Sequence, residues 1–221
     1  MSATLAVSLE TVRSVHDVAA VLAIIAITGT VLLVAARLIP TVASVRFLDA
    51  VYRVQLPLAA LVATTATAGS LWFSESGNHW QPCRFCWFQR IFMYSAAVIL
   101  IVAAIRRDRT SKWYVVTLAT IGIATSIWHH VFLEHGIVAE SKACASLISC
   151  ATPYYVSFGK LELGADGIIR EGFPMTLAAM ALSGFAAILA LLLLPQPLDL
   201  EDLEPLTTKR QEQEDGESQA G

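Results

Sequence analysis

The chain has 221 residues, of which 56% are hydrophobic and only 15% are charged, and its mean hydropathy is +0.61. Soluble domains usually carry about 25% charged residues, so this composition excludes an ordinary soluble domain and indicates a membrane protein. The net charge is -3, and no basic stripe points to a nucleic-acid partner.

Five apolar segments are each close to the length of about 20 residues that a membrane-spanning helix needs. The first follows a leader without a positive n-region and is longer than a signal-peptide core, so we expect a retained helix. Only the third contains a charged residue, Arg90. The predicted fold class is therefore an all-α membrane protein. The predicted spans are Val18–Ala36, Val54–Phe73, Trp87–Ile105, Trp113–Leu133 and Phe173–Leu194.

The distribution of Lys and Arg among the loops predicts the orientation. The loop after the first span and the segment "RRDRTSK" after the third are dense in basic residues, whereas the long loop 134–172 holds three spread over its length. The dense set is expected in the cytoplasm. Residues 1–17 then lie outside. The tail 195–221 lies inside, and with eight acidic and two basic residues we expect it to be disordered.

Four cysteines fall on the predicted outer side, where disulfides are permitted. Cys83 and Cys86 begin the third span, and Cys144 and Cys150 lie in the long loop. A four-cysteine zinc site is disfavoured because the second pair has five intervening residues and the compartment is oxidising. Two structural disulfides stay open, although a Cys-x-x-Cys loop is too small to stabilise much. A redox pair is favoured, because a helix N-terminus promotes the thiolate, and no metal is predicted.

Cationic and imidazole side chains are expected at the depth of the first pair. Cys86 and Arg90 are separated by four residues and share a helix face, so the guanidinium could stabilise a thiolate or an anionic acceptor. Alternatively, Arg90 only reaches the outer headgroups. His129 and His130 lie near the outer end of the fourth span. A thiolate, a cation and an imidazole at one level suit a redox headgroup with carbonyl oxygens, whereas an interfacial role without a ligand is the alternative.

These motifs together resemble a known family. "PCRFCWFQR", the later outer-loop cysteine pair and "WHHVFLE" are similar to the DsbB/BdbC disulfide bond formation proteins, which are membrane thiol:quinone oxidoreductases. The Cys-x5-Cys spacing and the following "FPM" resemble the BdbC branch. The likeness covers roughly Val54 to Leu194 and implies a four-helix transmembrane core at 50–194 in the bacterial inner (plasma) membrane. The additional N-terminal transmembrane helix 18–36 lies outside it.

The resemblance also implies roles for the residues near the membrane. Cys83 and Cys86 would face the quinone, a menaquinone or a ubiquinone, with Cys86 in contact with it. Arg90 would bind and polarise the quinone, and His130 aligns better than His129 with the family's quinone-proximal histidine.

The loop cysteines are implied to be the pair that exchanges with a partner. Cys144 and Cys150 would receive electrons from an extracytoplasmic DsbA-like thioredoxin-fold oxidase, with Cys144 as the site of attack. The chain would thereby reoxidise that partner. Two alternatives remain. One is a vitamin K epoxide reductase-like enzyme, although in that family the loop pair precedes the Cys-x-x-Cys. The other is a non-enzymatic membrane protein with structural disulfides or a metal site.

Overall fold

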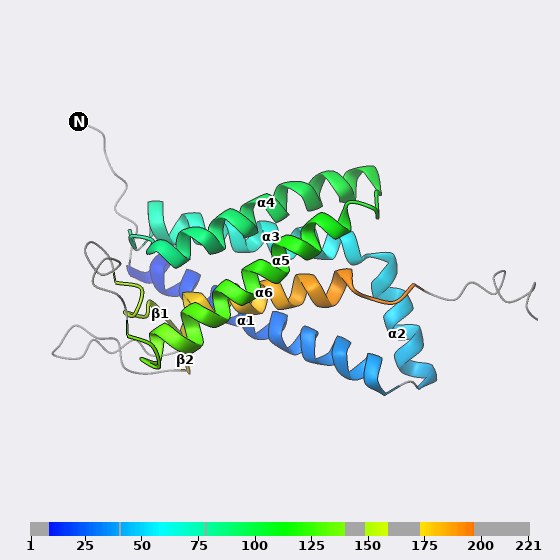
Figure 1. Cartoon of the computed structure of the whole chain (residues 1–221), viewed down its shortest axis with the longest axis horizontal. Helices are drawn as coiled ribbons and strands as arrows, with labels where there is room; N and C mark the ends of the chain where they lie inside the picture. Colours follow the sequence, from blue (N-terminus) through cyan, green and yellow to red (C-terminus); the bar gives the residue numbers. More distant parts are fainter. Residues whose placement is uncertain (1–8, 40, 78, 140–148, 159–172, 197–221) are drawn as a thin grey trace, which may run out of the picture.

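The computed structural model describes residues 9–39, 41–77, 79–139, 149–158 and 173–196. Within them, five long helices run side by side as a bundle, and a shorter helix, α2, crosses one end (Figure 1). Two π-helical segments, η1 and η2, extend α3 and α5. The α-helices are α1 (Leu9–Leu38), α2 (Val42–Arg53), α3 (Gln55–Leu71), α4 (Arg84–Arg106), α5 (Lys112–Ile127) and α6 (Leu177–Leu192).

The first four predicted spans are confirmed as apolar helices long enough to cross a membrane. They are Glu10–Leu38, Gln55–Ser76, Arg84–Arg106 and Lys112–Glu134. The second and fourth end in η1 (Trp72–Ser76) and η2 (Trp128–Glu134). With α6 completing the bundle, the chain is an all-α membrane protein apart from one small hairpin.

The fifth predicted span starts later than its apolar sequence suggests. Residues Phe173–Thr176 form strand β2, which pairs antiparallel with β1 (Tyr155–Phe158). Pro174 has no backbone N–H for a helix, and the Thr176 hydroxyl accepts a hydrogen bond from the backbone N–H of Ala179 at 3.1 Å. Such a cap starts the helix at the next residue, so α6 is 16 residues long.

Helix α2 occupies a stretch for which only a basic loop was predicted. Thr41 caps it reciprocally with Ser44: the Ser44 N–H donates to the Thr41 hydroxyl at 3.1 Å and the Thr41 N–H to the Ser44 hydroxyl at 2.7 Å. This capping box satisfies two backbone donors at the helix start. The predicted cytoplasmic loop is therefore mostly helical.

Small residues fill the centre of the bundle while large apolar side chains remain on its outside. Ala59, Ala96 and Ala119 are fully buried, whereas Ile25 and Val98 are at least 60% exposed. This arrangement suits a bilayer, because lipid solvates the large side chains and small residues let helices approach closely. Helices α5 and α6 approach closely at Gly122 of α5, where an added Cβ would lie 2.5 Å from the ring of Phe185 on α6.

Helix α1 is an integral member of the bundle and packs along α6. At one end the Arg37 guanidinium donates a hydrogen bond to the Leu193 carbonyl oxygen at 2.7 Å. At the other end Ala20 is buried against Phe73 and Val156. The strands, η1, η2 and the first turn of α4 all lie at this second end, and α2 lies at the opposite one (Figure 1). The Cys-x-x-Cys and the described part of the long loop therefore share one end of the bundle.

Candidate functional site

The Cys-x-x-Cys motif straddles the start of α4. Cys83 is the N-cap residue, with an extended backbone, and its sulfur accepts a hydrogen bond from the Cys86 N–H at 3.4 Å. Cys86 lies in the first turn, where backbone N–H groups point out of the helix and favour negative charge. The cap geometry thus places both sulfurs at the helix end.

The two sulfurs lie 3.1 Å apart as a hydrogen-bonded pair of thiols, with Cys83 as the donor. Cys83 is buried and Cys86 is half-buried. The hydrogen bond to Cys86, together with burial, raises the pKa of Cys83 to about 12. Cys83 therefore keeps its proton at neutral pH, and the Cys86 sulfur receives it as a hydrogen bond.

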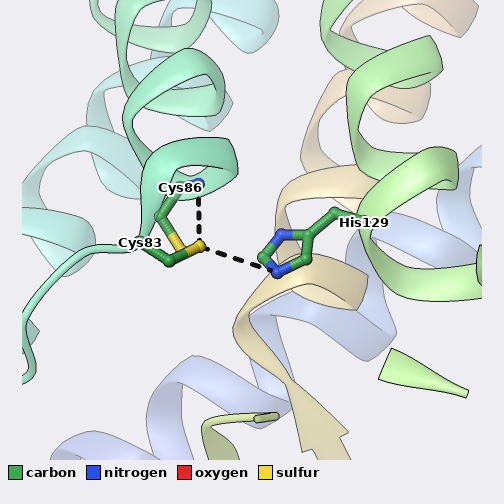
Figure 2. A group of neighbouring side chains, drawn as sticks. All are labelled: Cys83, Cys86 and His129. Atoms are coloured by element: carbon green, nitrogen blue, oxygen red, sulfur yellow. Dashed lines mark hydrogen bonds between the residues drawn. The ribbon is translucent and has the colours of Figure 1, made fainter. Parts of the chain in front are cut away.

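His129 of η2 faces this pair from the neighbouring helix (Figure 2). Its Nε2 atom lies 3.8 Å from the Cys83 sulfur and 3.1 Å from the Cys150 carbonyl oxygen. The ring is 3% exposed, and its Nδ1 atom has no hydrogen-bond partner among the described residues. An imidazole nitrogen thus lies beside both a buried thiol and a backbone carbonyl oxygen, and the carbonyl oxygen can only accept a hydrogen bond from it.

One cysteine of the long loop joins the same cluster. Cys150 is 1% exposed and is buried with Cys83 and Leu133. Burial, with a contribution from the neighbouring Cys83 sulfur, raises the pKa of Cys150 to about 12. Cys144, its predicted partner, lies outside the described residues. The structure therefore brings three of the four cysteines together.

Arg90 lies one turn further along α4 and is held by α3. Its Nε donates to the Ser70 hydroxyl and its Nη2 to the Ser70 carbonyl oxygen, both at 3.0 Å. Tyr94 donates to the same hydroxyl at 3.3 Å, and the guanidinium lies 5.4 Å from the Trp87 ring centroid. Ser70 was not predicted as a partner of Arg90, because it lies in a segment of small residues, "TTATAGS", whose sequence is typical of helix packing.

His130 belongs to a separate cluster. Its Nδ1 lies 2.6 Å from a carboxylate oxygen of Glu134 and 3.2 Å from the Thr176 hydroxyl, which donates to the same carboxylate oxygen at 2.9 Å. The structure thus places His129, rather than His130, beside the cysteines. Glu134 and Thr176 were not predicted, although the four-residue spacing between His130 and Glu134 was a usable signal.

Comparisons with known proteins identify the family of this chain. The family model described as "Disulfide bond formation protein DsbB" matches residues 52–195. A probable disulfide formation protein of Deinococcus radiodurans is 41% identical over 144 residues, covering 64% of this chain and 88% of that protein. Disulfide bond formation protein C of Bacillus subtilis is 41% identical over 105 residues, covering 47% and 74%.

The probable disulfide formation protein C of Halalkalibacterium halodurans is 33% identical over 99 residues, covering 45% of this chain and 72% of that protein. No solved structure matches the chain. Helix α1 precedes the matched region, which begins in the last turn of α2 and contains both cysteine pairs. The chain belongs to the DsbB family of disulfide bond formation proteins.

Proposed function

We propose that this protein is a thiol:quinone oxidoreductase of the bacterial inner membrane. It reoxidises an extracytoplasmic DsbA-like thioredoxin-fold oxidase through Cys144–Cys150 and Cys83–Cys86, and it delivers the electrons to a menaquinone or ubiquinone. The observation that carries this proposal is the single buried cluster that holds Cys83, Cys86 and Cys150. Exchange between two pairs requires their sulfurs to meet, and the contact of Cys150 with Cys83 supports such an exchange.

The first half of the reaction is thiol–disulfide exchange. A partner thiolate attacks the Cys144–Cys150 disulfide, a mixed disulfide forms, and the second partner thiol releases the partner oxidised. The loop pair is left as a dithiol. Its electrons pass to the Cys83–Cys86 disulfide by the same chemistry, through a bond between a loop sulfur and one of the first pair. The contact of Cys150 with Cys83 supports Cys83 as that sulfur.

The second half closes the Cys83–Cys86 disulfide and releases two electrons and two protons. A quinone can accept both electrons and both protons. His129, whose Nε2 lies 3.8 Å from the Cys83 sulfur, is proposed to take the Cys83 proton as the bond to Cys86 forms. This transfer requires the tautomer with its hydrogen on Nδ1, so the contact of Nε2 with the Cys150 carbonyl oxygen must open first. Because Cys83 holds its proton strongly, this transfer needs an adjacent base.

Arg90 fits a role toward a membrane-soluble acceptor with carbonyl oxygens. A guanidinium has five N–H donors, and the contacts with Ser70 use two of them. The remaining donors are available one turn from Cys86, beside the lipid-facing side chains of Trp87 and Ile91, each more than half exposed. A cationic donor there stabilises negative charge on an acceptor oxygen. His130 keeps its predicted role as the quinone-proximal imidazole.

Steady-state kinetics with purified protein test the proposal. Quinone reduction is followed by absorbance with a reduced thioredoxin-fold oxidase as donor. Cys86→Ser should abolish turnover. Arg90→Ala should lower kcat/KM for quinone by about 10- to 100-fold, as expected for a lost charged hydrogen bond. Arg106→Ala, exposed at the other end of α4, is the matched control and should behave like wild type.

Two outcomes would contradict specific parts of the scheme. Turnover by Cys86→Ser would remove this cysteine from electron transfer. An unchanged kcat/KM for quinone in Arg90→Ala would reduce Arg90 to an anchor between α3 and α4. Ser70→Ala, which removes one anchor and retains the cation, separates these two roles of Arg90.

We also propose that the end of the bundle with the cysteines faces outward, with residues 1–17 outside and 195–221 in the cytoplasm. The core 50–194 would then form the DsbB-like unit. A membrane-impermeant thiol reagent should label the reduced cysteines in intact spheroplasts. Labelling only after lysis would place the cysteines in the cytoplasm and would exclude an extracytoplasmic partner.

A further inference from the structure

The thiols and the imidazole at the start of α4 have a second chemical capacity. One ligand atom each from Cys83, Cys86 and His129 lies within 4.8 Å of the other two (Figure 2). The sulfur–sulfur distance is 3.1 Å and the distance from the Cys83 sulfur to the His129 Nε2 is 3.8 Å. Two sulfurs and an imidazole nitrogen are the ligands that zinc takes in proteins.

We propose that the reduced pair and His129 form a binding site for a thiolate-seeking divalent cation of the Zn²⁺ class. Tetrahedral zinc, with Zn–S of about 2.3 Å and Zn–N of about 2.1 Å, separates its ligand atoms by roughly 3.5–3.8 Å. The Cys83–His129 distance already meets this range, and a rotation of the half-buried Cys86 side chain widens the other. The fourth position is left to a solvent molecule or, after a movement of its side chain, to Cys150 of the same buried cluster.

The site exists in only one redox state. Binding replaces two thiol protons, so the dithiol and M²⁺ give the dithiolate complex and two H⁺. A Cys83–Cys86 disulfide offers no thiolate. The cation therefore holds the pair reduced and blocks electron transfer reversibly. In zinc sites a ligating histidine usually donates its other ring N–H to a partner. The His129 Nδ1 has none among the described residues, so we expect an exchangeable ion.

Titration of the reduced full-length protein with Co²⁺ or Cd²⁺ under inert gas tests the site through thiolate-to-metal charge-transfer absorbance. One ion should bind per chain, and the oxidised protein should show no band. Cys86→Ser and His129→Gln should each weaken binding by about tenfold or more. His135→Ala, an exposed histidine six residues away, is the matched control and should bind like wild type.

A band in the oxidised protein, or equal affinities for His129→Gln and His135→Ala, would overturn the proposal. X-ray absorption of the Zn²⁺-loaded wild type gives an answer without any variant: sulfur scatterers are expected, and coordination by oxygen and nitrogen alone would refute the site. These measurements involve no turnover, so they are independent of the quinone reaction.

A second inference concerns α1, which lies outside the family match. His16 of α1 is 1% exposed and packs its ring against Phe73 and Trp80, with centroids 5.4 and 5.5 Å away. Trp80 stacks on Tyr154 at 5.1 Å, and the Tyr154 hydroxyl donates to the Gln81 carbonyl oxygen at 3.0 Å. These residues flank the two cysteine segments, because Gln81 precedes Cys83 by two residues and Tyr154 follows Cys150 by four.

The geometry assigns α1 a positioning role: through His16 it holds the Cys83 and Cys150 segments together. This positioning role serves the proposed exchange between the cysteine pairs, but the test of the role does not depend on that exchange. With Cys86 and Cys144 replaced by serine, diamide takes two protons and two electrons from Cys83 and Cys150 and forms their disulfide. Non-reducing peptide mapping measures the rate.

His16→Leu should slow this disulfide formation several-fold, and His16→Phe, which restores a ring, should recover it. Val18→Ala, on the same helix with a 57% exposed side chain, should match wild type. Equal rates in His16→Leu and Val18→Ala would overturn the role of α1, as would a failure of His16→Phe to exceed His16→Leu. Neither result would argue for or against the proposed quinone reaction.

Discussion

The contact between Gly122 and Phe185 makes a quantitative test of the bundle. In Gly122→Ala the new Cβ would lie 2.5 Å from two ring carbons of Phe185 and 2.7 Å from a third. Phe185 is 0% exposed, so its ring has no free space to enter. Forcing extra volume into a packed core costs typically about 1–3 kcal/mol. Replacing Gly by Ala in a helix offsets part of this cost by about 0.8–1.0 kcal/mol.

Gly69→Ala isolates the steric part of that cost. Gly69 is also helical, but nothing lies within 4 Å of its added Cβ. The propensity gain is then common to both variants, and their free energies of unfolding should differ by about 1–3 kcal/mol. The assay is reversible unfolding in mixed micelles with increasing dodecyl sulfate, followed by circular dichroism.

A double variant completes this test. Phe185→Leu combined with Gly122→Ala should recover part of the lost stability, because the smaller side chain makes room for the methyl group. Equal shifts in Gly122→Ala and Gly69→Ala, or strictly additive effects in the double variant, would refute the close approach of α5 and α6.

Two further predictions follow from buried polar groups. In a variant that retains only Cys150, burial should hold the pKa of its thiol above the ordinary value, because desolvation is the largest cause of the shift. Only the thiolate is alkylated, so the rate should still rise about tenfold per pH unit where the exposed control Ser76→Cys has levelled, at about pH 9. A plateau for Cys150 at the same pH as the control would contradict its burial. Glu134→Ala should lower the free energy of unfolding by about 1–3 kcal/mol, because His130 and Thr176 lose their acceptor. Glu134→Gln should lower it less. A wild-type free energy of unfolding for Glu134→Ala in the same micelle assay would show that this cluster does not stabilise the fold.

Membrane spans were predictable because a helix that crosses a bilayer needs about 20 mostly apolar residues. Sequences such as Trp87–Ile105 satisfy this requirement by composition alone. The cysteine segments were predicted at the same end of the bundle because the third predicted span starts, and the fourth ends, on the same side of the membrane. By contrast, α2 depends on the reciprocal contact of Thr41 with Ser44, and the start of α6 on Pro174 and a hydroxyl cap. These are local hydrogen-bonding choices within stretches that otherwise look like loop or span.

The orientation of individual side chains was less accessible to sequence. Arg90 shares a helix face with Cys86, as spacing predicts, but its guanidinium is directed by Ser70 of another helix. The resemblance favoured His130 as the quinone-proximal histidine. Spacing alone could not predict that His129 is the one beside Cys83, because the turn that carries both residues is not α-helical. Residues 140–148 and 159–172, with Cys144, and the acidic tail from 197 onward lie outside the described residues, so the predictions for them stay predictions.

The π-helical segment η2 has a consequence for how this site can change during evolution. A π-helix bonds each residue to one five positions away and is frequently found at functional sites. Here it directs His129 to the thiols and His130 to the Glu134 carboxylate. Deleting Trp128 would rotate the rest of the segment. It would turn His129 away from the thiols and would move His130 and Glu134 together away from Thr176 in a single genetic event. Substitutions can alter either cluster alone, whereas length changes here act on the two clusters as one unit.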